Sequence, residues 1–172
     1  MISGSKCVDF MDSFPVDPSK LGAIPTATGV EFTLLTGPEA TSVQLLLIAD
    51  PSDRTNHTVH QMERVGNGGW KVFVEAAKPG DCYGFRVHGP YDPRQGLMYN
   101  PLKVVCDPFG KLIGDPGRNE PALYVYNPYD KTLVDKCDSL LCAPLSMVPP
   151  VDDFDWEDLK HLPRPPQDRL MI

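Results

Sequence analysis

Proline is the feature that most constrains how this chain can fold. The 172 residues include 19 prolines, about twice the usual share of roughly 5%. A proline in a helix interior removes a backbone hydrogen bond and clashes with the preceding turn. The sequence therefore disfavours long helices and predicts short elements joined by extensive loops, edges and linkers.

Short stretches with the period of a β-strand fill the first half of the chain. Alternating apolar and polar residues predict half-buried strands, and a short continuous apolar run predicts a central strand. Between two of them lies a Gly-Asn-Gly-Gly turn at 66–69, made of residues that tolerate positive φ. Strands at intervals of roughly 8–12 residues indicate a sandwich or a barrel. The predicted strands cover residues 30–34, 43–49, 57–62, 70–74 and 82–87.

The pattern changes after residue 87. Residues 88–101 are rich in glycine and proline and predict a loop. Residues 102–106 predict a strand or a short helix, and the loop that follows contains a possible helical turn at 109–113. Residues 124–130 are aromatic and polar without a clear period.

Composition divides the chain into five parts. We expect an irregular lead-in at 1–20, a β-sandwich at 21–110, and an extension at 111–147 that packs on the sandwich or on a missing domain. An acidic and then proline-rich linker follows at 148–169. The apolar triplet at 170–172 is interpreted as the first strand of that missing domain. The whole chain is shorter than the about 250 residues of a typical (β/α)₈ barrel.

Charge and cysteine content narrow the choice of partners. The net charge is -7 and the isoelectric point about 5.0, whereas nucleic acids and anionic membranes are bound by basic surfaces. The five cysteines form no zinc-like pair. Cys137 and Cys142 are a weak candidate for a metal, so we expect no metal and no cofactor, and free thiols in a reducing compartment. No signal peptide or membrane-spanning run is recognisable.

No group of residues predicts catalysis within this chain. His57 and His60 would point to opposite faces of a strand, which does not suit a shared metal. The acidic residues at 152–158 resemble a solvated linker more than the paired carboxylates of a glycosidase. We therefore assign no catalytic residue.

One segment carries a dense family resemblance. Residues 83–107 read YGFRVHGPYDPRQGLMYNPLKVVCD, which closely resembles the motif of bacterial glycogen debranching enzymes and plant isoamylases. Residues 21–35 and 143–156 are similar to two further stretches of that family. The resemblance implies an immunoglobulin-like sandwich, classed with the family-48 carbohydrate-binding modules, that precedes a barrel of glycoside hydrolase family 13.

The family resemblance also implies a function. The parent would hydrolyse α-1,6 branch points of glycogen or amylopectin with two carboxylates of the barrel, so this chain alone would be noncatalytic and inactive. Expected partners are α-glucan, the barrel and another isoamylase subunit, in the cytoplasm or, for a plant protein, the plastid. Residues 24–28 and 168–172 depart from the family pattern and resemble less active plant paralogues. A stand-alone α-glucan-binding module and an interaction module of a regulatory isoamylase subunit therefore remain alternatives.

Two sets of residues are candidates for the functional surface. Sugar faces stack on aromatic rings, so Trp70 and Tyr83 are candidates for carbohydrate binding, with core packing as the alternative for Trp70. The second set is expected to hold the sandwich against the barrel, with direct sugar binding as the alternative. It consists of Arg86, His88, Tyr91, Asn100, Lys103, Asp107 and Trp156.

Overall fold

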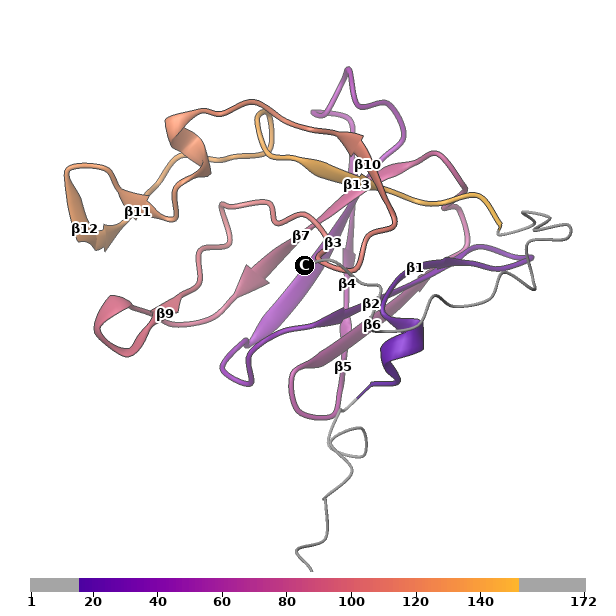
Figure 1. Ribbon diagram of the computed structural model, residues 1–172, viewed down its shortest axis with the longest axis horizontal. Coiled ribbons are helices and arrows are strands. Elements are labelled where there is room, and N and C mark those ends of the chain that lie inside the picture. The colour runs from indigo at the N-terminus through magenta and orange to yellow at the C-terminus, as the bar shows by residue number, and fades with distance from the viewer. Residues whose placement is uncertain (1–15, 152–172) are drawn as a thin grey trace, which may run out of the picture.

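The computed structural model describes residues 16–151 and is built from two antiparallel sheets packed face to face (Figure 1). The four-stranded sheet contains, in spatial order, β1 (Gly22–Pro25), β2 (Val30–Leu35), β6 (Gly69–Val74) and β5 (Glu63–Val65). The five-stranded sheet contains β10 (Leu112–Asp115), β13 (Leu145–Met147), β7 (Cys82–His88), β3 (Ser42–Ile48) and β4 (Thr58–Gln61). The prediction of an all-β, immunoglobulin-like sandwich is confirmed.

The remaining elements are short. Two hairpins lie outside the main sheets, β8 (Tyr91–Asp92) with β9 (Leu97–Met98), and β11 (Tyr126–Asn127) with β12 (Asp130–Val134). Within residues 16–151, the three single-turn 3₁₀ helices each begin at a proline, whose missing N–H would have no helical partner at that position. They are η2 (Pro18–Lys20), η3 (Pro93–Gln95) and η4 (Pro121–Leu123). Between residues 16 and 151, no helix is long and apolar enough to cross a membrane.

The main core lies between the two sheets. The strand period turns alternate side chains inward, and Phe32, Leu45 and Phe85 are fully buried there. Tyr83 joins this cluster, its ring packed edge to face at 5.0 Å from the ring of Phe32 and 5.8 Å from that of Phe85. The alternation in the sequence therefore marks the core-facing residues correctly.

A second core covers the opposite face of the five-stranded sheet. Leu46, Ile48 and Cys82 point away from the first core and are buried under side chains of the later chain, Val104, Ala143 and Leu145. A sheet buried on both faces needs strands that are apolar throughout, which accounts for the continuous run in β3. Gly84 belongs to this contact, because a Cβ atom there would lie 2.6 Å from a methyl group of Val104.

The extension at 111–147 completes the sandwich. β13 lies between β10 and β7 and pairs with β7 in the register Ser146↔Tyr83 and Met147↔Cys82. Strands β10 and β13 of the extension are thus part of the five-stranded sheet, and contact of the extension with a further domain stays a prediction. Residues 148–151 follow β13 directly, while the rest of the predicted linker, the triplet at 170–172 and Trp156 lie outside the described residues.

Two local predictions are corrected. The helical turn predicted at 109–113 is wrong, because residues 112–115 pair with β13 as strand β10. Residues 102–106 form neither a named strand nor a helix. They contain a single bridge, in which the Phe85 and Val105 backbones exchange hydrogen bonds of 2.9 and 2.8 Å. In both places tertiary pairing outweighs the local sequence pattern.

Candidate functional site: the motif residues and the hairpin they hold

Trp70 and Tyr83 are core side chains. Trp70 is 3% exposed and its indole N–H donates to the Thr36 hydroxyl at 2.9 Å. Tyr83 is fully buried. Stacking on a sugar needs an open ring face, so the prediction that these two rings bind carbohydrate is wrong, and the alternative of core packing holds for Trp70.

Tyr83 and Asp107 form a buried pair at the end of the motif. The Tyr83 hydroxyl donates to the Asp107 carboxylate at 2.7 Å, and the Phe109 N–H donates to the same carboxylate at 2.8 Å. Burial raises the pKa of Asp107, against the two hydrogen bonds that lower it. Burial first, and then the Asp107 charge, raises the pKa of Tyr83 far above its usual value. The pair fixes the turn that leads out of the motif.

Arg86 binds both a carboxylate and a carbonyl, the two partners suited to its planar fork of donors. One terminal nitrogen donates to the Pro101 carbonyl at 2.8 Å, and the other donates to both Asp138 oxygens at 2.9 and 2.8 Å. Asp138 in turn accepts from the Leu140 N–H at 2.8 Å. Arg86 therefore links strand β7 to the extension.

Lys103 is the most deeply buried cation of the motif. Its side chain is 4% exposed and its three N–H donors have three partners. These are the Asp135 carboxylate at 2.5 Å, the Cys137 carbonyl at 2.6 Å and the Ala122 carbonyl at 2.7 Å. The Lys103 ammonium holds the pKa of Asp135 below its usual value. One side chain thus connects two stretches of the extension, around Ala122 and at 135–137.

Asn100 and Tyr91 hold the β11–β12 hairpin. The Asn100 side-chain amide donates to the Asp135 carbonyl at 2.8 Å and to the Val125 carbonyl at 3.2 Å, one on each side of the hairpin base. The Tyr91 hydroxyl lies 3.1 Å from the carbonyl oxygens of both Lys131 and Leu133 in β12. Both side chains therefore fix the backbone of the hairpin and leave its side chains free.

His88 contacts a neighbouring strand, with its ring nitrogen 3.3 Å from the Gln44 amide oxygen. Across the described residues, then, all six placed motif side chains make polar contacts within this chain. The expected contact of these residues with another domain stays a prediction. Within the chain, four of them hold the extension on the sandwich, namely Arg86, Tyr91, Asn100 and Lys103.

The hairpin presents aromatic side chains that sequence reasoning passed over. The tip residue Tyr129 is 99% exposed and Tyr124 is 46% exposed. The rings of Tyr124 and Tyr126 lie with centroids 5.6 Å apart at an interplanar angle of 30°, and the Lys131 ammonium lies 5.4 Å from the Tyr126 centroid. The available signal was compositional, since three tyrosines and two charged residues fall within 124–131, a segment without a clear period.

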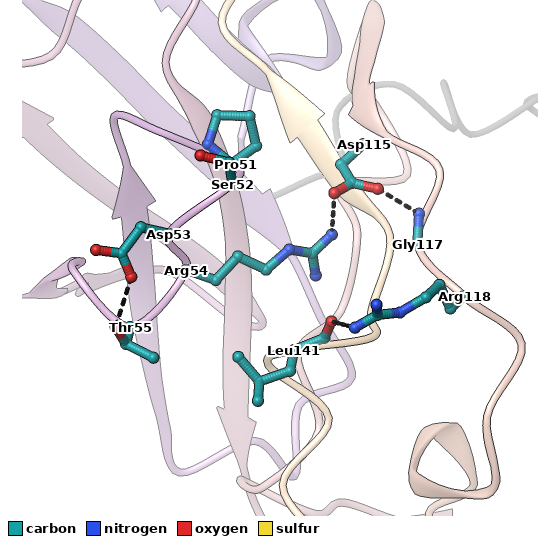
Figure 2. Close-up of a pocket in the computed structure, with 9 residues that line it drawn as sticks. All are labelled: Pro51, Ser52, Asp53, Arg54, Thr55, Asp115, Gly117, Arg118 and Leu141. Atoms are coloured by element: carbon teal, nitrogen blue, oxygen red, sulfur yellow. Dashed lines mark hydrogen bonds and ion pairs between the residues drawn. The ribbon is translucent and has the colours of Figure 1, made fainter.

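A cleft of about 400 Å³ separates the loop after β3 from the extension (Figure 2). Arg54 crosses it from the loop, forms an ion pair with Asp115, and donates to the Leu140 and Ala143 carbonyls at 2.8 and 2.7 Å. The hydrogen bond from Arg54 is the largest cause of a lowered pKa at Asp115. Arg118 donates to the Leu141 carbonyl at 2.9 Å. Arg54, Asp115 and Arg118 thus already have partners within the chain. Their contacts hold the loop after β3 against the extension, and we assign no ligand to the cleft.

The two packed antiparallel sheets, together with the extension that contributes β10 and β13, define an immunoglobulin-like β-sandwich module. Residues 20–110 match the family model of carbohydrate-binding module 48, the isoamylase N-terminal domain, and the chain belongs to this family.

Two similar proteins are glycogen debranching enzymes. The enzyme of Serratia proteamaculans (strain 568) is 35% identical over 140 residues, which are 80% of this chain and 20% of that enzyme. The enzyme of Erwinia tasmaniensis is 35% identical over 143 residues, 82% of this chain and again 20% of the enzyme. The chain thus spans about a fifth of the length of these relatives.

A solved structure shares the fold. It is the catalytic module of the multi-modular glycogen-degrading pneumococcal virulence factor SpuA, with a TM-score of 0.50 and 18% sequence identity. The match covers 75% of this chain and 16% of that one. At this identity the likeness shows the fold.

Proposed function

We infer that this chain is the noncatalytic, glucan-associated N-terminal domain of a glycogen or starch debranching enzyme. The observation that carries the inference is the identity of 35% to two glycogen debranching enzymes over four fifths of this chain. The parent would hydrolyse α-1,6-glucosidic branch points, using carboxylates of a catalytic barrel in the remaining four fifths of its length. The domain would orient that barrel and help to accommodate branched α-glucan.

The contacts of three carboxylates in the fold support a noncatalytic role for this domain, with catalysis in the rest of the parent. Asp107, Asp115 and Asp135 are each engaged by a hydrogen bond or ion pair within the fold. Glycoside hydrolysis instead uses two carboxyl groups that face a common substrate. The four described cysteines are free thiols, which supports a reducing compartment such as the cytoplasm or a plastid.

The inference is tested by an assay of the purified 172-residue chain on glycogen and amylopectin. We expect no release of linear chains, measured as new reducing ends, while an isoamylase added to the same substrate releases them. Sustained release by the chain alone, in preparations freed of contaminating amylase, would show that it is itself a hydrolase and overturn the noncatalytic assignment.

A second candidate is a module that binds α-glucan without the rest of the parent. The exposed rings of Tyr124 and Tyr129 favour it, because open aromatic faces are the surface that a pyranose ring stacks on. Co-sedimentation of the chain with glycogen measures this directly. Recovery in the supernatant at every glycogen concentration would leave the glucan contacts to the parent's barrel.

A further inference from the structure

The β11–β12 hairpin is held in place although it adds little to the core. All five residues of β12 are exposed, and Figure 1 shows the hairpin at the edge of the molecule, away from the two sheets. A two-stranded hairpin is marginally stable by itself in water. Its anchors are Tyr91, Asn100 and Lys103, which bind its backbone or its base. The contacts that stabilise it therefore serve to present its outer surface.

That outer surface is aromatic. Tyr124 and Tyr126 form a pair of neighbouring rings, 5.6 Å apart and inclined by 30°, with Tyr124 almost half exposed. Each tyrosine offers an apolar ring face and a hydroxyl that exchanges hydrogen bonds with a polar ligand. Two inclined rings provide a curved surface on which consecutive, mutually rotated pyranose rings can lie.

The polar groups beside the rings suit a neutral, hydroxyl-rich ligand. The Lys131 ammonium lies 5.4 Å from the Tyr126 ring centroid and offers donors to sugar hydroxyls. Asp130 accepts from the Thr132 hydroxyl at 2.6 Å and provides the opposite charge close by. The hairpin thus carries both signs, on a chain of net charge -7, and this balance disfavours a polyanion such as nucleic acid.

We propose that Tyr124 and Tyr126, with Lys131 beside them, form a binding site for an α-1,4-glucan chain on the β11–β12 hairpin. The site rests on the proposed glucan association of the domain and gives it a location. It differs from the sequence prediction, which placed stacking at Trp70 and Tyr83, because those two rings are buried, whereas Tyr124 is 46% exposed and Tyr126 is partly exposed.

The test is glycogen co-sedimentation of the full 172-residue chain, followed by titration with maltoheptaose. In the variant Tyr124→Ala/Tyr126→Ala we expect the affinity for both probes to fall by roughly ten-fold or more, since the stacking surface is lost. The variant Tyr124→Phe/Tyr126→Phe keeps the rings and should bind within about three-fold of the unaltered chain. Phe73→Ala is the matched control, because Phe73 is also 46% exposed but lies on β6 in the other sheet.

The possible outcomes separate the site from the function. The site is supported if the unaltered chain and Phe73→Ala bind both probes and the alanine pair does not. The alanine pair must also keep the near-UV circular dichroism spectrum and the thermal unfolding profile of the unaltered chain. Equal binding by the unaltered chain and the alanine pair overturns the site and leaves glucan association in place. Failure of the unaltered chain to bind either probe overturns the site and removes the support for glucan association by this domain alone.

Discussion

Lys103 shows how a single motif residue organises the extension. Its ammonium group is almost completely removed from water and is compensated by one carboxylate and two carbonyls. A buried ion pair contributes little net stability when intact, but loss of one partner leaves a buried charge without compensation. The pair with Asp135 therefore matters chiefly as a constraint on where residues 122–137 can lie.

This ion pair makes stability depend on pH. The pKa of Asp135 lies below its usual value of 3.8 in the folded chain, with the hydrogen bond from Lys103 as the largest cause. A carboxyl whose pKa is lowered by folding contributes stability that is complete above its unfolded pKa and is lost as the pH falls through its folded pKa. Asp135→Asn should thus lower the free energy of unfolding by about 3 kcal/mol near neutral pH and by less near pH 2, because the stability contributed by the ionised carboxylate is lost as the pH falls through its lowered pKa.

Urea denaturation at the two pH values measures the difference. Asp138→Asn serves as the control, because Asp138 also pairs with a motif cation but is 49% exposed, and exposed pairs contribute at most about 1 kcal/mol. An equal loss for Asp135→Asn at both pH values would show that the ionised pair is not the cause.

At this scale the sequence identifies residues better than it identifies their partners. The motif singled out Arg86 and Lys103, and the fork of Arg86 does bind a carboxylate and a carbonyl, as its chemistry suggests. Their acidic partners, Asp138 and Asp135, lie more than thirty positions further on, in a segment without a periodic pattern. Such pairs are decided by the path of the extension, which the local sequence does not encode.

Among the elements, five strands of the two main sheets are those that the sequence predicted. β2, β3, β4, β6 and β7 coincide with predicted strands to within one or two residues, because each shows alternation or an apolar run. The strands of the two main sheets that were missed, β1, β5, β10 and β13, have four residues or fewer, too few to show a clear period. β1 even ends at Pro25, which is tolerated because β1 lies at a sheet edge. Their pairing comes from the neighbouring strands.

Asn100 is one of the side chains that hold the β11–β12 hairpin. Asn100 donates to carbonyls on both sides of the hairpin base, and Asp135 and Val125 also share a backbone hydrogen bond of 3.0 Å. Asn100→Asp retains the shape but removes both donors. We expect hydrogen exchange of the Asp135 amide to accelerate by about ten-fold or more, the effect of losing two hydrogen bonds.

Hydrogen exchange followed by mass spectrometry resolves the hairpin from the sheets. The Phe85 amide, bonded to Val105 in the centre of the fold, should keep its protection in the same variant and serves as the internal control. Unchanged exchange over 124–135 in Asn100→Asp would mean that the hairpin is held by its other contacts alone.

At the scale of the whole molecule, the two edge strands of the five-stranded sheet differ in the apolar side chains that they expose. β10 and β4 are the edge strands, and β10 carries Leu112 and Ile113 at 40% and 57% exposure. An exposed apolar edge strand is a template for pairing with another chain. In the proposed parent this edge is a surface on which the barrel can pack, and in the isolated domain it remains open to water.

We therefore expect the isolated chain to self-associate through β10. Ile113→Lys should weaken the association by roughly ten-fold, because a charged edge residue opposes strand pairing. Light scattering coupled to size-exclusion chromatography over a concentration series measures it. Val59→Lys is the matched control, since Val59 is 51% exposed on the opposite edge strand. Weakening by Val59→Lys alone would place the contact at the other edge.

The late position of β13 in the sequence also determines the order in which parts of the core can form. Strands β3 and β7 are complete by residue 88, but the cluster on their outer face is complete only when Ala143 and Leu145 join Val104 there. Pairings between segments distant in the sequence form late in folding. Until they form, the uncovered apolar faces of the sheet are prone to misassembly. During synthesis on the ribosome, Leu46 and Ile48 must stay exposed until nearly the entire domain has emerged. A shortened gene that stops at residue 110, where the family match ends, would yield a sandwich that never passes this stage.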